Sequence, residues 1–438
     1  MKKALSCILL FLIAIVLSAC SLPFLGSSKT QNIKLSYWGL WEPEQAMRSV
    51  IADYQRLHPN ITIEYKKMSP QRYRETVTAR LAEGNGPDIF RFHNTWLPMM
   101  KNELAQVPSG VMDTQTIERV FYPIVKRDLK IGSQYYGLPL EIDSLALFIN
   151  SDILKAAGAT PPTSWEEFKS LAQRLTVKDA SGKILTAGAA LGTTNNIQHW
   201  SDILGLMLLQ NGTDVTKIDA TILPDGSNAG ADALDYYVSF AKGDTKVWDD
   251  TMDDSMLAFA QGKLAMFFGP HWQIFDIKTL NQNLNFYVVP VPQLSGGKAN
   301  WATYWVEGVA RRSKYQKEAF EFLSYLVQKD TLKKLYSEAS KLRLFGEPYS
   351  RVDMADLIKD DPLAGTFVKQ TDTLTSWYLS SRTFDNGIND LIIQYFADAV
   401  NGVYKDSTTT KTALSTVNTG VAKILERYGI KITLQEPK

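Results

Sequence analysis

Tryptophans at or just beyond expected strand ends, or in loops, are the most distinctive chemical feature of the sequence. Flat aromatic faces suit the apolar C–H faces of sugar rings, while Asp, Asn, Glu or Arg side chains bond the hydroxyls. Ligands of open α/β sheets bind outside the carboxyl ends of strands, so this placement indicates a carbohydrate site, although each tryptophan alone could be a core residue. We interpret Trp165, inside an expected helix, as core and leave Trp301 open. The seven tryptophans of this kind are Trp38, Trp41, Trp96, Trp200, Trp272, Trp305 and Trp377.

No local motif for catalysis or metal binding occurs in the sequence. A nucleophile elbow, a phosphate-binding loop, a dinucleotide fingerprint and an H-E-x-x-H zinc motif are all absent. The four histidines form no H-x-x-x-H pair, and the acidic stretch 249–254 lacks the glycine and distal glutamate of a calcium loop. We therefore predict no enzyme activity, no metal and no cofactor. A surface glycoside hydrolase stays an alternative, because it needs only two carboxylates brought together by folding, here from Glu42, Asp143 or Glu307.

The N-terminus has the features of a secretory signal. Lys2 and Lys3 precede an apolar run over residues 4–16, which leads into Leu-Ser-Ala-Cys at 17–20. The run is shorter than the roughly 20 residues that span a bilayer. The small residues before Cys20 resemble the bacterial lipobox, in which the cysteine is lipidated and becomes the mature N-terminus. We predict a lipoprotein signal peptide at 1–19 and a lipid-anchored tether at 20–30.

Composition excludes several classes of protein. The two cysteines, Cys7 and Cys20, leave the chain after the signal without a disulfide or a cysteine-ligated metal. Removing Lys2 and Lys3 from 47 basic residues leaves 45 against 46 acidic ones, so nothing indicates a nucleic-acid partner. The length of 438 residues exceeds that of a usual single core, and 45% hydrophobic residues suffice for two. Two lobes are therefore expected.

Hydrophobic periodicity predicts elements that would place these residues. The strands and helices alternate, which argues for an α/β fold with mainly parallel sheets. A serine or threonine three residues before a glutamate at 163–167 has the signature of a helix-capping box. Strands are expected at 33–38, 61–65, 88–92, 145–150 and 263–268, and helices at 42–57, 71–82, 165–175 and 410–428.

Several motifs, in this order, resemble the family-1 extracellular solute-binding proteins of bacterial ABC transporters, the family of the maltose-binding protein. The likeness spans nearly the whole chain after the signal. The motifs are Tyr-Trp-Gly at 37–39, Gly-Pro-Asp-Ile-Phe at 86–90, Tyr-Gly-Leu-Pro at 136–139, Ala-Leu-Phe-Ile-Asn at 146–150, Pro-Thr-Ser-Trp-Glu-Glu-Phe at 162–168, Phe-Ala-Gln-Gly-Lys-Leu-Ala-Met at 259–266 and Ala-Phe-Glu-Phe-Leu at 319–323.

The resemblance implies a two-lobed periplasmic-binding-protein-like fold of type II. Each lobe would have a mainly parallel sheet flanked by helices, and a hinge crossed several times would join them. Lobe one would take residues 31–142 plus 298–344, and lobe two residues 143–297 plus 345–438. The ligand would lie in the cleft between them.

The resemblance also implies which residues face the cleft, carried over by position. Asp88 is expected to cap a loop rather than touch the ligand. Glu307-Gly308 departs from the small residues or glycine pairs that relatives often have. The candidate ligand-binding residues are Trp41, Glu42, Arg91, Asn94, Trp96, Asp143, Asn196, Trp200, His271, Trp272, Tyr304, Trp305, Glu307, Trp377 and Arg382.

The implied function is that of a monomeric receptor, lipid-anchored on the outside of the cell membrane, that delivers a sugar or oligosaccharide to an ABC permease. Because Arg91 and Arg382 are placed to bind an anion, anionic sugars stay an alternative class of ligand. Besides the hydrolase, two alternatives remain: a binding protein for another solute such as a peptide, and an adhesin or signalling module that kept the fold and lost its transporter.

Overall fold

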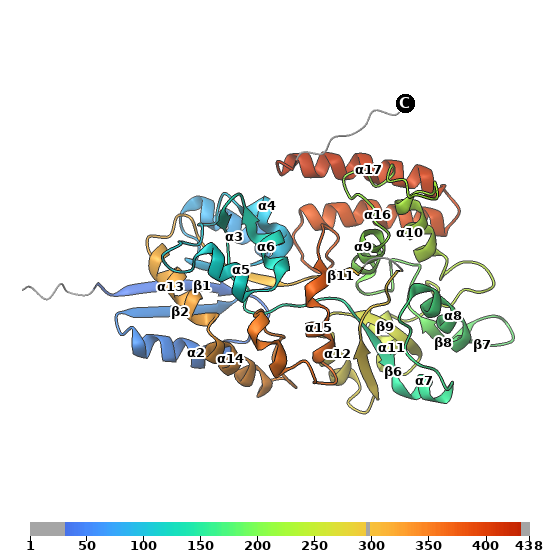
Figure 1. The fold of residues 1–438 in the computed structure, drawn as a ribbon, viewed down its shortest axis with the longest axis horizontal. Helices are drawn as coiled ribbons and strands as arrows, with labels where there is room; N and C mark the ends of the chain where they lie inside the picture. The colour runs from blue at the N-terminus through green and yellow to red at the C-terminus, as the bar shows by residue number, and fades with distance from the viewer. Residues whose placement is uncertain (1–30, 295–297, 431–438) are drawn as a thin grey trace, which may run out of the picture.

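The computed structural model describes residues 31–294 and 298–430. The predicted signal peptide, tether and lipidation site at Cys20 lie outside the described residues. The chain forms two lobes, at the left and right of Figure 1, each with a sheet covered by helices. In the described part of the chain, no helix is long and apolar enough to span a bilayer.

The sheet of lobe one is mainly parallel, as predicted. Its strand order is β12-β3-β1-β2, and only β12 is antiparallel to its neighbour. In β1 alternate residues such as Leu35 and Tyr37 are buried, and α2 buries Met47, Val50 and Tyr54 along one stripe. The elements of this lobe are β1 (Ile33–Gly39), α2 (Glu44–Leu57), β2 (Ile61–Lys67), α3 (Tyr73–Glu83), β3 (Ile89–His93), η1 (Asn94–Trp96), α4 (Leu97–Met100), α5 (Thr114–Val120), α6 (Pro123–Leu129), β4 (Lys130–Ile131), β5 (Gln134–Tyr135), β12 (Trp305–Val309), α13 (Gln316–Leu326), α14 (Lys329–Ser340) and η2 (Val352–Leu357).

The sheet of lobe two is mixed, which corrects the mainly parallel sheet expected there. Its order is β10-β6-β9-β8-β7, and only β8 and β9 are parallel. β6 follows directly on the segment that joins the lobes, whereas β9 runs back so that Gly269 pairs with Ala146. Strand β6, which enters lobe two from the hinge, is therefore antiparallel to β9, which runs back toward the hinge. Its elements are β6 (Ala146–Asn150), α7 (Ser151–Ala156), α8 (Trp165–Leu175), β7 (Val177–Lys178), β8 (Ile184–Ala189), α9 (Trp200–Gln210), α10 (Ala229–Val238), α11 (Ser255–Ala260), β9 (Leu264–Gly269), α12 (Gln273–Leu280), β10 (Phe286–Val289), α16 (Ile388–Tyr404) and α17 (Thr410–Arg427).

Local signals read from the sequence reappear in the structure. Ser164 caps α8 by accepting a hydrogen bond from the Glu167 backbone, and Glu167 accepts one from Ser164 in return, so the capping box is confirmed. Asp88 accepts bonds from Ser36 and Ser313 and so ties down its loop. Trp165 is buried, as predicted.

Two hydrophobic cores define the lobes, and the chain crosses between them three times. The first core ends at Ile142 and resumes at Ala302, while the second begins at Leu145 and includes Trp301. A third crossing, over 358–377, contains α15 (Gly365–Lys369), η3 (Thr371–Thr373) and β13 (Leu374–Thr375). Strand β13 pairs in parallel with the short strand β11 (Asn300–Trp301). Tyr349 still packs in the first core, beyond the boundary expected at residue 344.

Candidate functional site

A cavity of about 340 Å³ lies between the two lobes and contacts both of them. Lobe one supplies the loop after β1 and the start of β12, and lobe two supplies the starts of α9 and α12 and the loop before α16. The first crossing forms one wall. The lining residues are Trp41, Glu42, Pro43, His93, Glu141, Asp143, His199, Pro270, Trp272, Phe275, Asp276, Thr303, Tyr304, Trp305, Arg343, Glu347, Ser381, Arg382 and Thr383.

Three partly exposed indole rings face this cavity. Trp41 and Trp305 of lobe one meet edge to face, with centroids 5.6 Å apart. Trp272 of lobe two has the Arg382 guanidinium 4.9 Å from its ring centroid and the His199 ring 5.5 Å away. The two lobes therefore present flat apolar surfaces to whatever occupies the space between them.

Strained backbone positions the cavity's side chains. Trp41, His199 and Arg382 have φ angles of 47°, 58° and 57°, and they are three of the seven non-glycine residues with positive φ in the described chain. Such conformations persist only where the surroundings enforce them, and they cluster at functional sites. Their presence on three separate loops of one cavity supports a role for it beyond packing.

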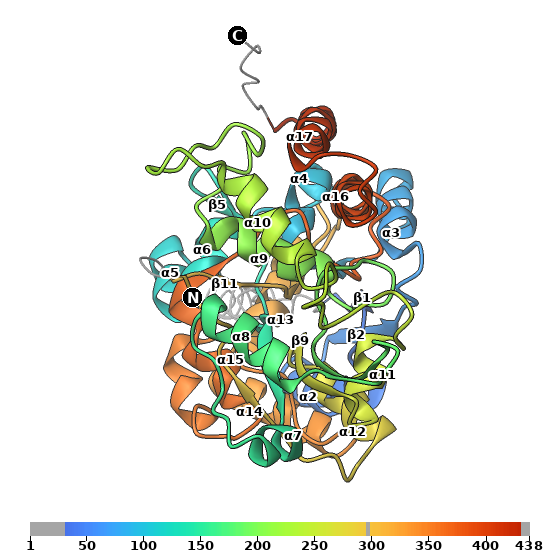
Figure 2. The same ribbon diagram turned by 90° about the vertical axis from the view of Figure 1, so that its right-hand side faces the viewer.

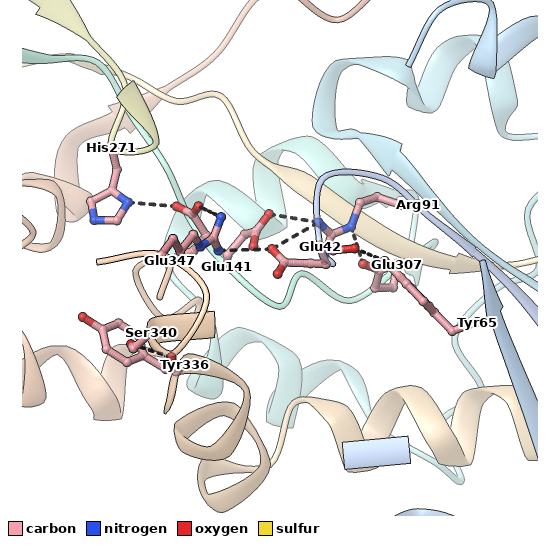
Figure 3. Close-up of polar contacts among 10 residues, drawn as sticks. Glu42, Tyr65, Arg91, Glu141, His271, Glu307, Tyr336, Ser340 and Glu347 are labelled. Atoms are coloured by element: carbon pink, nitrogen blue, oxygen red, sulfur yellow. Dashed lines mark hydrogen bonds and ion pairs between the residues drawn. The ribbon is translucent and has the colours of Figure 1, made fainter. Parts of the chain in front are cut away.

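A buried ion network forms the base of the cavity (Figure 3). Its centre is Arg91 of β3, of which 1% is exposed. The Arg91 guanidinium lies 2.6 Å from Glu307, 3.3 Å from Glu141 and 3.9 Å from Glu42. A single cation thus faces three carboxylates.

The network continues across the lobes through Arg343, which follows α14. Its guanidinium lies 3.5 Å from Glu42 and 2.9 Å from Glu347. Glu347 in turn lies 2.8 Å from Nδ1 of His271, which belongs to lobe two (Figure 3). The network therefore joins the two lobes at the hinge.

Asp143, on the first crossing, has a different environment. Its Oδ1 accepts hydrogen bonds from the backbone N–H groups of His271, at 2.9 Å, and Ser144, at 2.7 Å. No lysine or arginine of the described chain forms an ion pair with it. Asp143 thus fixes the loop after β9 to the hinge while facing the cavity.

Burial and the crowding of like charges shift the pKa values of these acids. Burial raises the pKa of Glu141 to about 8, against the opposing effect of Arg91. Burial also raises the pKa of Asp143 well above its ordinary value, and the charge of Glu347 adds to this effect. Burial alone would raise the pKa of Glu347, but Arg343 and the His271 hydrogen bond lower it. The site thus holds protonated and ionised carboxyls side by side at neutral pH.

His93 lines the cavity as a neutral group. Burial lowers its pKa to about 3, and its two ring nitrogens lie 2.8 Å from Thr95 Oγ1 and 3.0 Å from Thr303 Oγ1. The described residues contain no cluster of histidine, cysteine and acidic side chains able to hold a metal ion. The arrangement is suited to holding a ligand through hydrogen bonds and ring stacking.

The structure places the candidate residues from the sequence in three groups. Seven line the cavity: Trp41, Glu42, Asp143, Trp272, Tyr304, Trp305 and Arg382. Three are almost fully buried in the ion network behind it: Arg91, His271 and Glu307. Five lie outside the cavity wall: Asn94, Trp96, Asn196, Trp200 and Trp377.

The five residues outside the wall have structural contacts. Asn94 donates to Asp128, and Asn196 donates to the carbonyls of Asp249 and Met252. Fully buried Trp96 packs behind Trp305, with centroids 5.3 Å apart. Trp200 starts α9 and packs against the lobe-two core. Trp377 lines a second cavity of about 320 Å³, beside Asp128, Arg127 and Tyr378.

The sequence analysis missed several wall residues. Glu141 lies two residues before Asp143 on the same crossing, so the crossing itself was a usable signal. Arg343 and Glu347 are four residues apart and enter the site from the segment that follows α14, which no local pattern places there. The remaining missed residues are Pro43, His93, His199, Pro270, Phe275, Asp276, Thr303, Ser381 and Thr383.

Comparison with known proteins identifies the family. A family model described as "Bacterial extracellular solute-binding protein" matches residues 39–332. The chain belongs to this family. The membership predicted from the motifs is therefore confirmed.

Curated relatives of this solute-binding protein are distant. Binding proteins of Brucella abortus and Brucella suis are 22% identical over 280 residues, and the match spans 66% of their length and 62% of this chain. A multiple sugar-binding protein of Streptococcus mutans is 20% identical over 74% of this chain and 78% of its own. A maltooligosaccharide ABC transporter solute-binding lipoprotein of Streptococcus pneumoniae is 27% identical over 64% and 63%.

Solved structures confirm the two-lobed fold of the solute-binding protein. A cyclo/maltodextrin-binding protein with maltotetraose matches with a TM-score of 0.72 and 18% identity, over 90% of this chain and 97% of that one. The sugar-binding protein MalE of Xanthomonas citri also matches at 0.72, with 17% identity over 90% and 98%. At such identities the likeness concerns the fold.

Proposed function

We propose that this solute-binding protein is the substrate receptor of an ABC importer, anchored by lipid at Cys20 outside the cell membrane, and that it captures a sugar or oligosaccharide. The observation that carries the proposal is the cavity shared by both lobes, with indole rings on both sides and carboxylates at its base. Aromatic faces suit sugar rings, and carboxylates accept hydrogen bonds from hydroxyls. The sugar-binding names of several relatives support the same class of solute.

The receptor works by closing around its solute. Trp41 and Trp305 come from lobe one and Trp272 from lobe two, so the ligand completes its contacts only when the lobes approach. Closure that depends on ligand gives a permease a way to distinguish loaded from empty receptor. The matched relatives are named as binding proteins, and the carboxylates Glu42 and Glu307 both face Arg91, which supports binding without hydrolysis.

A thermal-shift screen of the protein from residue 21 onward tests this function. Neutral, anionic and amino sugars and their oligomers form the panel, and amino acids and short peptides serve as controls. A ligand at 100 times its Kd stabilises the folded state by about 2.7 kcal/mol. We expect a sugar to raise the Tm and to be recovered intact by chromatography. A shift with peptides alone would reject the sugar receptor, and sugar breakdown would favour the hydrolase.

The anchor is tested separately in cells. Wild-type protein should partition into the detergent phase and incorporate a labelled fatty acid, and Cys20→Ala should do neither. Labelling that persists in Cys20→Ala would contradict the anchor without affecting the receptor function.

A further inference from the structure

Acidic side chains outnumber basic ones around the cavity. Its wall contains the carboxylates Glu42, Glu141, Asp143, Asp276 and Glu347, against the guanidinium groups of Arg343 and Arg382. Behind the wall, Arg91 and Glu307 add one charge of each sign. An enclosed ligand therefore meets more acidic groups than basic ones.

The ion pairs inside the network do not remove this excess. Glu42, Glu141 and Glu307 share one guanidinium, that of Arg91, and Arg343 is divided between Glu42 and Glu347. Among the described residues, Asp143 receives only backbone N–H groups and no cation. In a poorly hydrated cleft, carboxylates without their own counter-charge attract a cation strongly.

An unpartnered oxygen independently points to a ligand. Glu42 is 3% exposed and lines the cavity, yet its Oε2 finds no hydrogen-bond partner among the described residues. Buried polar atoms are nearly always paired, so an exception calls for a missing partner. Because a carboxylate oxygen only accepts hydrogen bonds, its missing partner is a donor, while Trp41 Nε1 of the same wall also finds no partner among the described residues and calls for an acceptor such as a sugar hydroxyl.

The neighbouring rings favour a cationic donor. Trp41 precedes Glu42 in the chain and contacts Trp305, and both rings line the same cavity. Indole faces attract ammonium groups, and desolvation strengthens that attraction. Carboxylates beside partly exposed indoles form an environment that suits an ammonium on a sugar ring.

We propose that the solute is a saccharide with a free primary ammonium group, and that this group binds beside Glu42, Glu141 and Asp143 while the sugar ring stacks on Trp41 or Trp305. The inference rests on the sugar-receptor function proposed above and names its substrate class. It also explains why the cavity wall contains more acidic side chains than cations.

Protonation of the unliganded site agrees with this assignment. Burial raises the pKa of Glu141 to about 8, so a proton stands in for a missing cation on this carboxyl at neutral pH, and burial shifts the pKa of Asp143 in the same direction. An arriving ammonium releases the proton of Glu141. The charged and titratable groups that face these two acids are Glu42, Tyr65, Arg91, His271, Glu307, Arg343 and Glu347.

Isothermal titration calorimetry tests the inference with the protein from residue 21 onward. The probes are glucosamine, galactosamine and short glucosamine oligomers, compared with their N-acetylated and neutral counterparts of equal length. We expect the amino forms to bind at least tenfold more tightly than either counterpart. Titrations in two buffers of different ionisation enthalpy should show proton release for the amino forms alone.

A variant pair assigns the effect to the site. Glu42→Gln should weaken binding of the amino sugar about tenfold more than binding of the neutral sugar, since the amide keeps the size of the side chain and loses its charge. Glu44→Gln, at an exposed position two residues on, should change neither. The Tm of each variant shows whether it folds.

Each other outcome overturns the inference. Neutral or acetylated sugars that bind as tightly as the amino forms would reject the ammonium and leave the sugar receptor standing. Binding confined to lysine or arginine peptides, or to no member of the panel, would reject both the ammonium sugar and the proposed function.

Discussion

Two of the contacts between the lobes have opposite physical character. At the hinge, buried charges of both signs join Glu307, Arg91, Arg343, Glu347 and His271 in one network (Figure 3). Near α16, the segment 385–389 makes single hydrogen bonds with α3, with η1 and with Met99 of α4. Figure 2 shows these elements side by side at the top of the molecule.

The second contact is built from single hydrogen bonds rather than ion pairs. Asn389 donates to Thr95 Oγ1 at 2.7 Å in a buried bond, Arg74 donates to the Asp385 carbonyl in a partly buried one, and Asn386 donates to Glu75 at 3.3 Å in an exposed one. The loop holds non-glycine residues with positive φ at 382, 384 and 386. A typical hydrogen bond contributes about 0.5–1.5 kcal/mol, so each costs less to break than a buried ion pair.

The two contacts should therefore behave differently when the lobes open. Breaking a buried ion pair costs several kcal/mol, because the charge that loses its partner is not solvated by water. The hinge network should therefore persist when the lobes open. Hydrogen bonds at the edge of the cleft are the ones that opening should break. The four predictions below test this division, in order of decreasing effect.

Removing Arg91 should have the largest effect. Arg91→Met leaves Glu42, Glu141 and Glu307 without their common cation, and the free energy of unfolding should fall by about 3–5 kcal/mol. The loss should shrink as pH falls from 8 to 5, because protonation neutralises the stranded carboxyls. Urea unfolding at several pH values measures both effects.

The matched control is Arg56→Met, which removes an exposed ion pair to Asp53. Surface pairs contribute about 0–1 kcal/mol, so its stability should stay close to that of the wild type. Equal losses in both variants would show that the network is no more important than a surface pair.

Trp305→Ala should come next, through the ligand. Its indole lies in the cavity wall against Trp41, and loss of an aromatic anchor should weaken sugar binding by at least about tenfold, or 1.4 kcal/mol. Trp377→Phe, in the other cavity, should leave affinity unchanged. Calorimetry with the sugar that gives the largest thermal shift in the screen measures the affinity of both variants. A larger loss of affinity for Trp377→Phe than for Trp305→Ala would place the site in the second cavity.

These two tryptophans also show how far the sequence leads. The strand, helix and capping signals were sufficient to predict the strands and helices named in the sequence analysis. Together with the family motifs, they were sufficient to predict the two-lobed fold. They placed Trp305 and Trp377 alike in the site, because a position near a strand end does not reveal which way a side chain faces. Only the tertiary structure separates the wall of one cavity from the other.

The ion network was less predictable still. Arg91, Glu141 and Arg343 come from three distant segments, and no local spacing links them. Glu307 was predicted to bind the ligand and was noted as a departure from the family pattern, and its burial beside Arg91 now gives that departure a physical reason. Which distant charges pair depends on how the chain crosses between the lobes, and hydrophobic periodicity does not reveal those crossings.

A smaller effect is expected from Glu141 through pH. Its folded-state pKa of about 8 lies above its value in the unfolded chain, so its contribution to stability is complete at low pH and is lost as pH rises toward 8. Glu141→Gln removes this titration, and the urea midpoint should then vary less between pH 5 and 8 than in the wild type. An unchanged pH profile would show that Glu141 is not the group that takes up the proton.

The smallest effect should come from Arg74, at the edge of the cleft. Arg74→Ala removes its hydrogen bond to the Asp385 carbonyl and touches neither the cavity nor the ion network. Weakening a contact made only in the closed state shifts the population toward the open one, which reduces apparent affinity by the same factor.

For one partly exposed hydrogen bond this factor is about twofold to tenfold, corresponding to about 0.5–1.5 kcal/mol. The free energy of unfolding should stay nearly constant, and the radius of gyration from small-angle scattering should increase without ligand. Arg80 lies on the same helix, and its one ion pair among the described residues is with Glu83, so Arg80→Ala should alter neither quantity. If Arg74→Ala lowered stability as much as Arg91→Met does, the edge contact would be part of the permanent fold, and the division between a lasting hinge and a separable edge would fail.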